Sequence, residues 1–445
     1  LSGDWSSDVC SSDLIAGVAA DIEPRFAAIL ERCLHRLPEQ RFASAEELRE
    51  ALEELDVASR SAAVPEGNPY RGLLAFEAEH RALFFGRDSE IGTLLERLRT
   101  DPFVLVAGDS GTGKSSLCRA GVLPRVATRG LDLAASGEPG RKRAYRTVQL
   151  VPGRRPAAAL AAALAPELAK SEDEIVHLLR DRPDALRAAL AAHVGGERGL
   201  LIFVDQLEEL LTLSDADEAT VVAEALGRLA RRVPGVRLLM SIRGDFLARA
   251  TVLPGLGDEL TPAIYLLRPL SPEKMRQAIV GPARSKGVTF ESDALVESLI
   301  ASTGQAEGGL PLLQFALSEL WEVKPVASSV ITARSLEEIG GVEGALARHA
   351  DHVLHRLLAA QQSAARRMLC ALVTLERTRA RRMAQELTFD DANAAAALDA
   401  LVRGRLLVAS EVEGGTAVEI AHEALVTGWF TLRHLLDEQA EAQRE

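Results

Sequence analysis

Cysteine, long apolar runs and net positive charge are all scarce in this sequence of 445 residues. The four cysteines lie far apart and form neither a CxxC pair nor a disulfide framework, which favours a reducing compartment. No apolar run approaches the roughly 20 residues of a membrane span, and no secretory signal pattern is present. A net charge of −13 disfavours nucleic acid and anionic membranes as partners. We therefore expect a cytoplasmic protein with no membrane partner.

The composition is that of a folded protein, with 47% hydrophobic and 26% charged residues. Its length suggests about three domains. Residues 4–14 read DWSSDVCSSDL, which looks like a translated sequencing adapter, so we leave residues 1–14 out of the fold. The alternative is a polar, disordered natural N-terminus. On the adapter interpretation, we expect the chain to be a fragment of a longer gene product.

A helical hairpin is predicted between Asp21 and Leu55, where apolar residues recur at helical spacing. Pro38 breaks the pattern, and Ser44 followed by Glu47 forms a capping box for the second helix. The spacing alone leaves open a generic hairpin of two short helices.

The same stretch resembles the last two helices of a bacterial serine/threonine protein kinase domain. The residues that match the CL…P…R pattern of that family are Cys33, Leu34, Pro38 and Arg41. In kinases the arginine pairs with a glutamate of the activation segment, but the chain contains no HRD, DFG or glycine-rich kinase loop. The resemblance implies a missing kinase upstream and no kinase activity in this fragment.

After a linker rich in Ser, Ala, Pro and Gly, β-type runs alternate with helical runs. The β-type runs are Phe103 to Ala107, Tyr145 to Val151, Leu200 to Val204, Val236 to Ile242 and Ala263 to Leu267. This alternation predicts an α/β fold whose five-stranded, largely parallel sheet has helices on both faces. After Ser271 the chain reads mostly helical. Two β-type runs between Arg405 and Ala421 flank the turn Glu413-Gly414-Gly415, which suggests a winged helix.

A GxxxxGK[ST] pattern lies where the first β-type run gives way to a helical run. Its glycines let the backbone approach phosphate groups, which the positive end of the helix dipole stabilises. Lys114 is expected to reach the β and γ phosphates, and Ser115 to offer its hydroxyl to Mg²⁺. The nucleotide-binding residues predicted for this P-loop are Gly108, Asp109, Ser110, Gly111, Thr112, Gly113, Lys114, Ser115 and Ser116.

The run LLIFV ends at Asp205, which places a carboxylate at the C-terminal edge of a buried parallel strand. Asp205 is predicted to bind Mg²⁺ with Ser115, while Glu208 or Glu209 polarises the attacking water. Alternatively, the two glutamates belong only to a solvated helix face. Many ATPases of this kind carry an acid directly after the aspartate, but Gln206 stands there in this chain. We therefore expect slow hydrolysis.

The run RLLMSI leads into Arg243 beside the same sheet edge. Arg243 could sense the γ phosphate, or it could pair with Asp245 within the chain. The predicted catalytic residues are Lys114, Asp205, Glu208, Glu209 and Arg243, with Ser115 and Asp205 as the metal ligands.

These motifs resemble the novel STAND class of signal-transduction NTPases, relatives of the apoptotic and plant-resistance ATPases. In that class an hhGRExE pattern helps to hold the nucleotide base, and here Phe84 to Glu90 matches it, with Asp88 where glutamate is usual. The resemblance implies that Gly86 and Arg87 bind nucleotide.

Two further stretches resemble the same class. Pro311 in GGLPLLQFALSELW matches the GxP motif of its helical lid, whose proline packs on adenine, although plain packing is an alternative. The run AHEALVTGWFTLRHLLDE is similar to the end of its winged helix and places His422 where a histidine can read the β phosphate. A structural or exposed histidine is the alternative interpretation. The predicted divisions are residues 1–14 (artefact), 15–57 (kinase remnant), 58–67 (linker), 68–270 (P-loop NTPase), 271–345 (helical lid) and 346–445 (winged helix).

The resemblance implies a signalling switch that uses ATP/ADP and Mg²⁺ and hydrolyses ATP slowly. ADP would hold the NTPase, lid and winged helix closed, whereas ATP would favour an open, self-associating form that controls the linked kinase. A C-terminal repeat sensor, common in this class, is expected outside this chain. One alternative is a DNA-binding transcriptional regulator; another, without a small-substrate motif to support it, is a metabolic ATPase or nucleotide kinase. In the DNA-binding alternative the phosphate contacts would be Arg366, Arg367, Arg377, Arg379, Arg381 and Arg382.

Overall fold

The computed structural model of the chain forms two compact units, Leu1–Glu66 and Gly67–Glu445. The boundary between them lies in the predicted linker. The residues that the structure describes are 24–35, 37–45, 47–48, 52, 64–132, 142–194, 198–212, 214–231, 233–303, 309–325, 328–374, 379–389, 391–404, 406–412, 415–421, 425–426 and 429–442. The adapter-like segment, Arg377 and His422 lie outside these residues.

The first unit contains the helix α2 (Pro24–Cys33) and the short 3-10 helix η1 (Pro38–Gln40). The Oγ of Ser44 accepts a hydrogen bond from the backbone N–H of Glu47 at 3.1 Å, as the predicted capping box requires. The Glu47 carboxylate, however, accepts from the backbone of Ala43 at 2.6 Å instead of returning to Ser44. Half of the predicted capping box is therefore present, and the Glu47 side chain caps the residue before Ser44.

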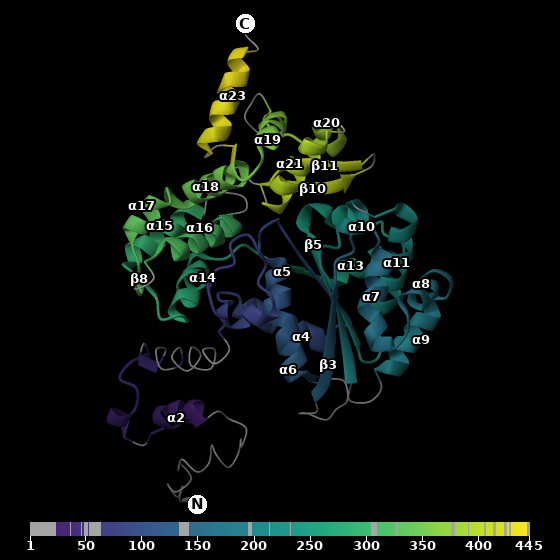
Figure 1. Ribbon diagram of the computed structural model, residues 1–445. Helices are drawn as coiled ribbons and strands as arrows, with labels where there is room; N and C mark the ends of the chain where they lie inside the picture. Colours follow the sequence, from purple (N-terminus) through teal and green to yellow (C-terminus); the bar gives the residue numbers. More distant parts are fainter. Residues whose placement is uncertain are drawn as a thin grey trace, which may run out of the picture. The chain divides into compact units, whose positions relative to one another are not determined.

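A six-stranded sheet of order β2-β3-β4-β5-β1-β6 organises the second unit (Figure 1). All neighbouring strands run parallel except β2, which is antiparallel to β3. The predicted parallel sheet is thus confirmed, while the short strand β2 was not predicted. The strands are β1 (Phe103–Gly108), β2 (Leu131–Asp132), β3 (Lys142–Leu150), β4 (Arg198–Val204), β5 (Val236–Arg243) and β6 (Ile264–Leu266).

Alternate residues of the central strands enter two different hydrophobic cores, as a sheet covered on both faces requires. Val104 and Val106 pack with one set of helices, whereas Leu105 and Ala107 pack with the other. The first set comprises α4 (Asp88–Thr100), the π-helix η3 (Leu117–Val122) and α6 (Leu123–Arg129). The second set comprises α7 (Pro156–Leu168), α8 (Glu172–Asp181), α9 (Pro183–His193), α11 (Ala216–Ala230) and α13 (Gly257–Ala263).

Short elements connect these layers. They are the 3-10 helix η2 (Ala78–Leu83), α5 (Lys114–Ser116), α10 (Glu209–Thr212), the 3-10 helix η5 (Gly244–Phe246) and α12 (Leu247–Ala250). Among the helices in the described part of the chain, none is long and apolar enough to cross a membrane.

The rest of the second unit is mainly helical and begins with α14 (Pro272–Arg284). Then follow β7 (Thr289–Phe290), α15 (Asp293–Thr303), α16 (Gly309–Val323), β8 (Val330–Ile331), α17 (Ala333–Glu338) and α18 (Gly341–His355). The C-terminal part comprises α19 (Ala359–Ala371), β9 (Arg382–Met383), α20 (Ala384–Thr388), α21 (Ala392–Arg403), β10 (Leu407–Val412), β11 (Gly415–Ile420) and α23 (Phe430–Ala442). The predicted hairpin is present as the antiparallel pair β10 and β11, and β9 adds a third strand that was not predicted.

One hydrophobic core joins the helices after Ser271 to the C-terminal elements. The predicted boundary at residues 345–346 falls inside α18, whose buried side chains Ala345 and Leu346 both belong to this core. Trp429 is fully buried there, and its Nε1 donates to Asp351 Oδ1 of α18 at 2.7 Å. The helical periodicity of α18 continues across the point where the sequence motifs change, so the residues on either side of the predicted boundary share one helix and one core.

Candidate functional site

The P-loop connects β1 to α5, so the predicted motif lies at a strand-to-helix turn. Gly111 and Gly113 have φ of 79° and 90°, which residues with a side chain rarely adopt. The turn is closed by Thr112, whose Oγ1 donates to the carbonyl of Asp109 at 2.9 Å. The side chains of Asp109 and Ser110 are exposed. The loop therefore has the tight, glycine-dependent backbone on which phosphate binding relies.

Lys114 folds over the loop that precedes it. Its Nζ donates to the carbonyls of Gly108 at 2.7 Å and Asp109 at 2.8 Å. Burial lowers the pKa of Lys114, and the neighbouring Glu208 carboxylate opposes that shift. The amine thus lies at the loop, as expected for a phosphate ligand.

Ser115 and Asp205 are brought together although ninety positions separate them in the sequence. Ser115 Oγ donates to Asp205 Oδ1 at 2.9 Å, and the carboxylate is only 1% exposed. Ser241 on β5 also donates to Oδ1, at 2.5 Å. A hydroxyl beside a carboxylate is the hard oxygen pair that Mg²⁺ prefers when phosphate and water supply its other ligands. No cluster of three or more His, Cys, Asp or Glu suited to a metal occurs among the described residues.

Arg119, on the π-helix η3, is a third side-chain partner of Asp205. Its Nε and Nη2 lie 3.0 and 2.8 Å from Asp205 Oδ2, while its Nη1 donates to Glu77 Oε1 at 2.7 Å. Burial opposes its charge, but the hydrogen bonds and charges of Glu77 and Asp205 raise the pKa of Arg119. The predicted metal ligand is therefore held by a cation that the motifs did not reveal.

The two candidate glutamates have different surroundings. The Glu208 carboxylate accepts from the backbone N–H of Arg243 at 3.2 Å, and burial raises its pKa while the Lys114 charge lowers it. Glu209 accepts from the backbone N–H of Gly153 at 2.8 Å, and burial likewise raises its pKa. Glu208 thus interacts with the P-loop lysine, whereas Glu209 fastens the loop after β3.

Arg243 and Gln206 flank this site. The Arg243 guanidinium pairs with Asp245 at 2.8 Å, which is the intramolecular alternative considered for it. Gln206 adopts φ of 58°, and its backbone N–H donates to Ser241 Oγ at 2.9 Å. The backbone after Asp205 thus turns sharply to reach the serine that also contacts the carboxylate.

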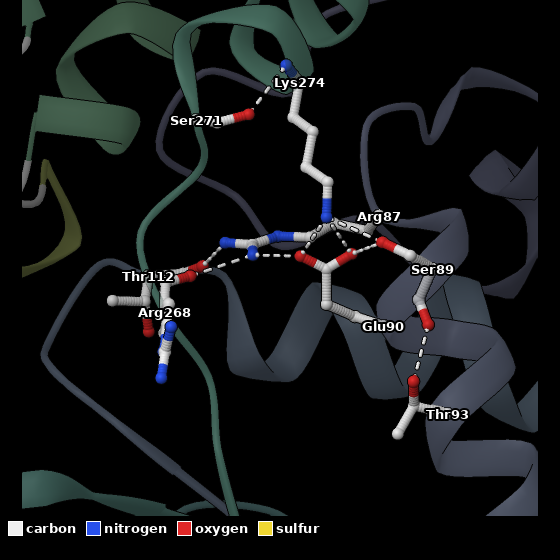
Figure 2. Close-up of polar contacts among 8 residues, drawn as sticks. All are labelled: Arg87, Ser89, Glu90, Thr93, Thr112, Arg268, Ser271 and Lys274. Atoms are coloured by element: carbon white, nitrogen blue, oxygen red, sulfur yellow. Dashed lines mark hydrogen bonds and ion pairs between the residues drawn. The ribbon is translucent and has the colours of Figure 1, made fainter.

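The hhGRExE segment contacts the P-loop and α14, as Figure 2 shows. Arg87 is 3% exposed and donates to the carbonyls of Thr112 at 2.8 Å and Arg268 at 2.9 Å. It also bonds Glu90 at 3.0 Å, and Lys274 of α14 donates to both oxygens of Glu90 at 2.9 Å. The Arg87 guanidinium, predicted to bind nucleotide, is thus engaged with the backbone of the phosphate-binding loop.

Gly86 lets α14 approach this segment closely. A Cβ at Gly86 would lie 2.4 Å from the carbonyl oxygen of Lys274, and its φ is 82°. At the start of α16, a Cβ on Gly113 would lie 3.7 Å from Leu310, the neighbour of Pro311. Two helices beyond the sheet therefore contact residues of the predicted site.

Four residues of this site were missed by sequence reasoning. Arg119 had a signal, because it lies four positions after Ser115 and so shares its helix face. Ser241 also had one, since it precedes Arg243 by two positions on a strand. Glu77 and Lys274 gave no such signal, because only the tertiary fold brings them to the site. Ser116, a predicted ligand, accepts a hydrogen bond from the backbone N–H of Phe76 at 3.1 Å.

Comparison with known proteins gives one family match. A family model described as Novel STAND NTPase 1 matches residues 69–445. The Walker-type ATPase of Pyrococcus abyssi is a similar solved structure, with 14% identity and a TM-score of 0.41 over 80% of this chain and 97% of that one. The ORC2 protein of Aeropyrum pernix, in ADPNP-ADP complexes, has 14% identity and a TM-score of 0.46 over 80% and 94%. A search of curated proteins gives no match.

Proposed function

The chain belongs to the novel STAND NTPase 1 family, and on that premise we propose that it is an ATP-dependent signalling switch. The observation that carries the proposal is the hydrogen bond from Ser115 to Asp205 at 2.9 Å. Ser115 directly follows Lys114 in the P-loop. Ser115 and Asp205 supply a hydroxyl and a carboxylate oxygen to Mg²⁺. Lys114 and the loop N–H groups bind the phosphates of ATP or ADP.

Hydrolysis in this proposal is slow. Glu208 polarises the attacking water, because its half-buried carboxylate has a raised pKa and interacts with Lys114. Glu209 is already engaged with the backbone of Gly153. Gln206 provides no second acid beside Asp205, so stabilisation of the attacking water is incomplete. Bound ATP consequently persists long enough to act as a signal.

The switch depends on helices that contact the P-loop. Leu310 of α16 lies against Gly113, and Lys274 of α14 contacts both Gly86 and Glu90. We assign residues 271–345 to a lid and 346–445 to a winged-helix domain, with Pro311 packing on adenine and His422 reading the β phosphate. If Arg243 releases Asp245, its guanidinium can contact a γ phosphate.

Different nucleotides shift the populations of two forms only if they bind those forms with different affinity. ADP stabilises the closed form, and ATP stabilises an open form that self-associates.

Molar mass measured by light scattering after size-exclusion chromatography tests the switch. We expect a larger mass with MgATP than with MgADP. In the Lys114→Ala control, ATP affinity should fall roughly 100-fold through loss of a charge-assisted contact, with unchanged far-ultraviolet circular dichroism. Equal wild-type masses would remove the switch. Retained ATP affinity in Lys114→Ala would instead remove the P-loop assignment.

We do not propose DNA binding. The helix α21 stands where a winged helix would present its recognition helix, and it is rich in alanine. Its basic residue, Arg403, is ion-paired with Asp399 at 2.8 Å. A gel shift with random duplex DNA at low salt should therefore be negative.

We further propose that residues 15–57 are the end of a protein kinase domain whose activity the switch controls. Arg41, which a kinase would pair with its activation segment, here donates to the carbonyl of His35 at 2.7 Å. The unbroken genomic reading frame around the chain tests this directly. A frame without kinase motifs upstream would refute the assignment.

A further inference from the structure

Arg119 bridges two carboxylates that belong to different parts of the site. Its Nε and Nη2 contact Asp205 Oδ2 at 3.0 and 2.8 Å, and its Nη1 contacts Glu77 Oε1 at 2.7 Å. The contacts to Asp205 use the oxygen that does not face Ser115, because Ser115 and Ser241 both donate to Oδ1. Each oxygen of the carboxylate thus has its own partners, and the group is fixed in one orientation.

The helical turn that carries Arg119 has an unusual geometry. Leu117–Val122 form a π-helix directly after the short helix of the P-loop. Such segments are rare and occur frequently at functional sites, where they redirect a side chain. Ser115 and Arg119 consequently contact the same carboxylate from one continuous stretch of chain.

Glu77 is itself held in place by the segment that leads into the NTPase fold. The residue before it, Phe76, donates its backbone N–H to Ser116 Oγ at 3.1 Å, and the backbone N–H of Glu77 donates to His80 Nδ1 at 3.2 Å. Further back, the hydroxyl of buried Tyr70 donates to the carbonyl of Ile279 in α14 at 2.5 Å. Glu77 therefore approaches Arg119 from an anchored backbone.

We propose that Arg119 and Glu77 are positioning residues for magnesium: Glu77 holds the Arg119 guanidinium, which turns the Asp205 carboxylate so that Oδ1 faces Ser115 and the metal. This inference rests on the proposed function, because it concerns the Mg²⁺ that accompanies the nucleotide. Residues that orient a metal ligand typically change metal affinity about 10- to 100-fold when they are removed. Loss of Glu77 would also leave the positive charge of Arg119 less neutralised beside the metal. Both effects weaken Mg²⁺ binding.

The test is a Mg²⁺ titration of fluorescent ATP binding, followed by anisotropy on the whole chain. Glu77→Gln should raise the Mg²⁺ concentration for half-maximal binding about tenfold. It should leave the affinity for fluorescent ADP in EDTA unchanged. A general loss of structure would lower that affinity as well. The matched control is Glu79→Gln, because Glu79 carries the same charge two positions away, its side chain is 75% exposed, and it lies 3.5 Å from His80 Nε2 and not from the Nδ1 that accepts from Glu77. Glu79→Gln should behave as the wild type.

A second variant tests whether Glu77 acts through Arg119. In Arg119→Gln, the amide nitrogen occupies the same position along the side chain as Nε, so a donor to buried Asp205 is kept and the bond to Glu77 is lost. In that background Glu77→Gln should change the Mg²⁺ dependence less than twofold, because coupled residues are not additive. A tenfold effect in both backgrounds would show that Glu77 acts by another route and would overturn the inference.

The outcomes separate this inference from the proposed function. If the wild type binds neither fluorescent nucleotide, with or without Mg²⁺, the proposed function fails. If it binds both and Glu77→Gln has the wild-type Mg²⁺ dependence, the proposed function stands and the positioning role is wrong.

Discussion

Arg87 and Arg119 both attach to the phosphate-binding region, but they have different partners. Arg87 is 3% exposed and donates to two backbone carbonyls and one glutamate. The Arg119 side chain is 21% exposed and donates to two carboxylates. A backbone carbonyl has no role in the chemistry, whereas a carboxylate can also bind a metal ion. The comparison therefore separates an arginine bonded mainly to backbone carbonyls from one bonded to a candidate metal ligand.

The largest expected difference between Arg87 and Arg119 is in how much their substitution lowers the free energy of unfolding. Arg87→Met removes a nearly buried guanidinium from the carbonyls of Thr112 and Arg268 and from Glu90, and we expect the free energy of unfolding to fall by about 3 kcal/mol. Arg119→Gln keeps one donor to Asp205, whose other oxygen still accepts from Ser115 and Ser241, and should cost less, about 1 to 2 kcal/mol. Urea denaturation followed by circular dichroism measures both. Arg87→Lys should not recover the loss, because an ammonium lacks the planar fork that reaches both carbonyls. Equal losses in Arg87→Met and Arg119→Gln would remove the distinction.

A smaller effect concerns Glu90, whose carboxylate contacts both Arg87 and Lys274 of α14. Burial would raise the pKa of Glu90, but hydrogen bonds from Lys274, Ser89 and Arg87 outweigh it and lower the pKa to about 2. The unfolded value is about 4.3, so the ionised carboxylate stabilises the fold above that pH. This stability should be lost as the pH falls from about 5 to about 2.

Glu90→Gln tests this pH dependence. It should lower the free energy of unfolding at pH 7 by about 1 to 2 kcal/mol, a figure reduced for solvent screening. It should also make the free energy of unfolding depend less on pH between about 5 and 2. The matched control is Glu96→Gln on the same helix, since the Glu96 side chain is 64% exposed and pairs only near the surface with Arg99. An unchanged pH dependence in Glu90→Gln would contradict the assignment.

The sheet could be predicted from the sequence because its signals are local. The β-type runs are rich in apolar residues and end at a turn or a polar residue, so the five parallel strands were recognised within a few residues. The strand β2 has two residues and β9 also has two, too few for any pattern. The division at residues 345–346 stays a prediction, and one core continues through the helix that it crosses.

The site was predictable only where a motif carries the chemistry. Lys114, Ser115 and Asp205 follow from strand-to-helix turns, and the structure places them together. The contact of Glu77 with Arg119 joins residues 42 positions apart. The contact of Lys274 with Glu90 joins residues 184 positions apart. No local pattern encodes such pairs, because they depend on where whole segments pack.

The smallest expected effect lies at Gln206, whose φ of 58° is strained for a residue with a side chain. Its contact with the site runs through the backbone, because the N–H donates to Ser241 Oγ at 2.9 Å and Ser241 in turn donates to Asp205. Gln206→Gly keeps that contact and relieves about 1 kcal/mol of strain, partly offset by the greater freedom of glycine in the unfolded chain. We expect a net gain of about 0.5 kcal/mol in urea denaturation and an unchanged Mg²⁺ dependence. A loss above about 1 kcal/mol would mean that the Gln206 side chain, like that of Arg87, holds the fold.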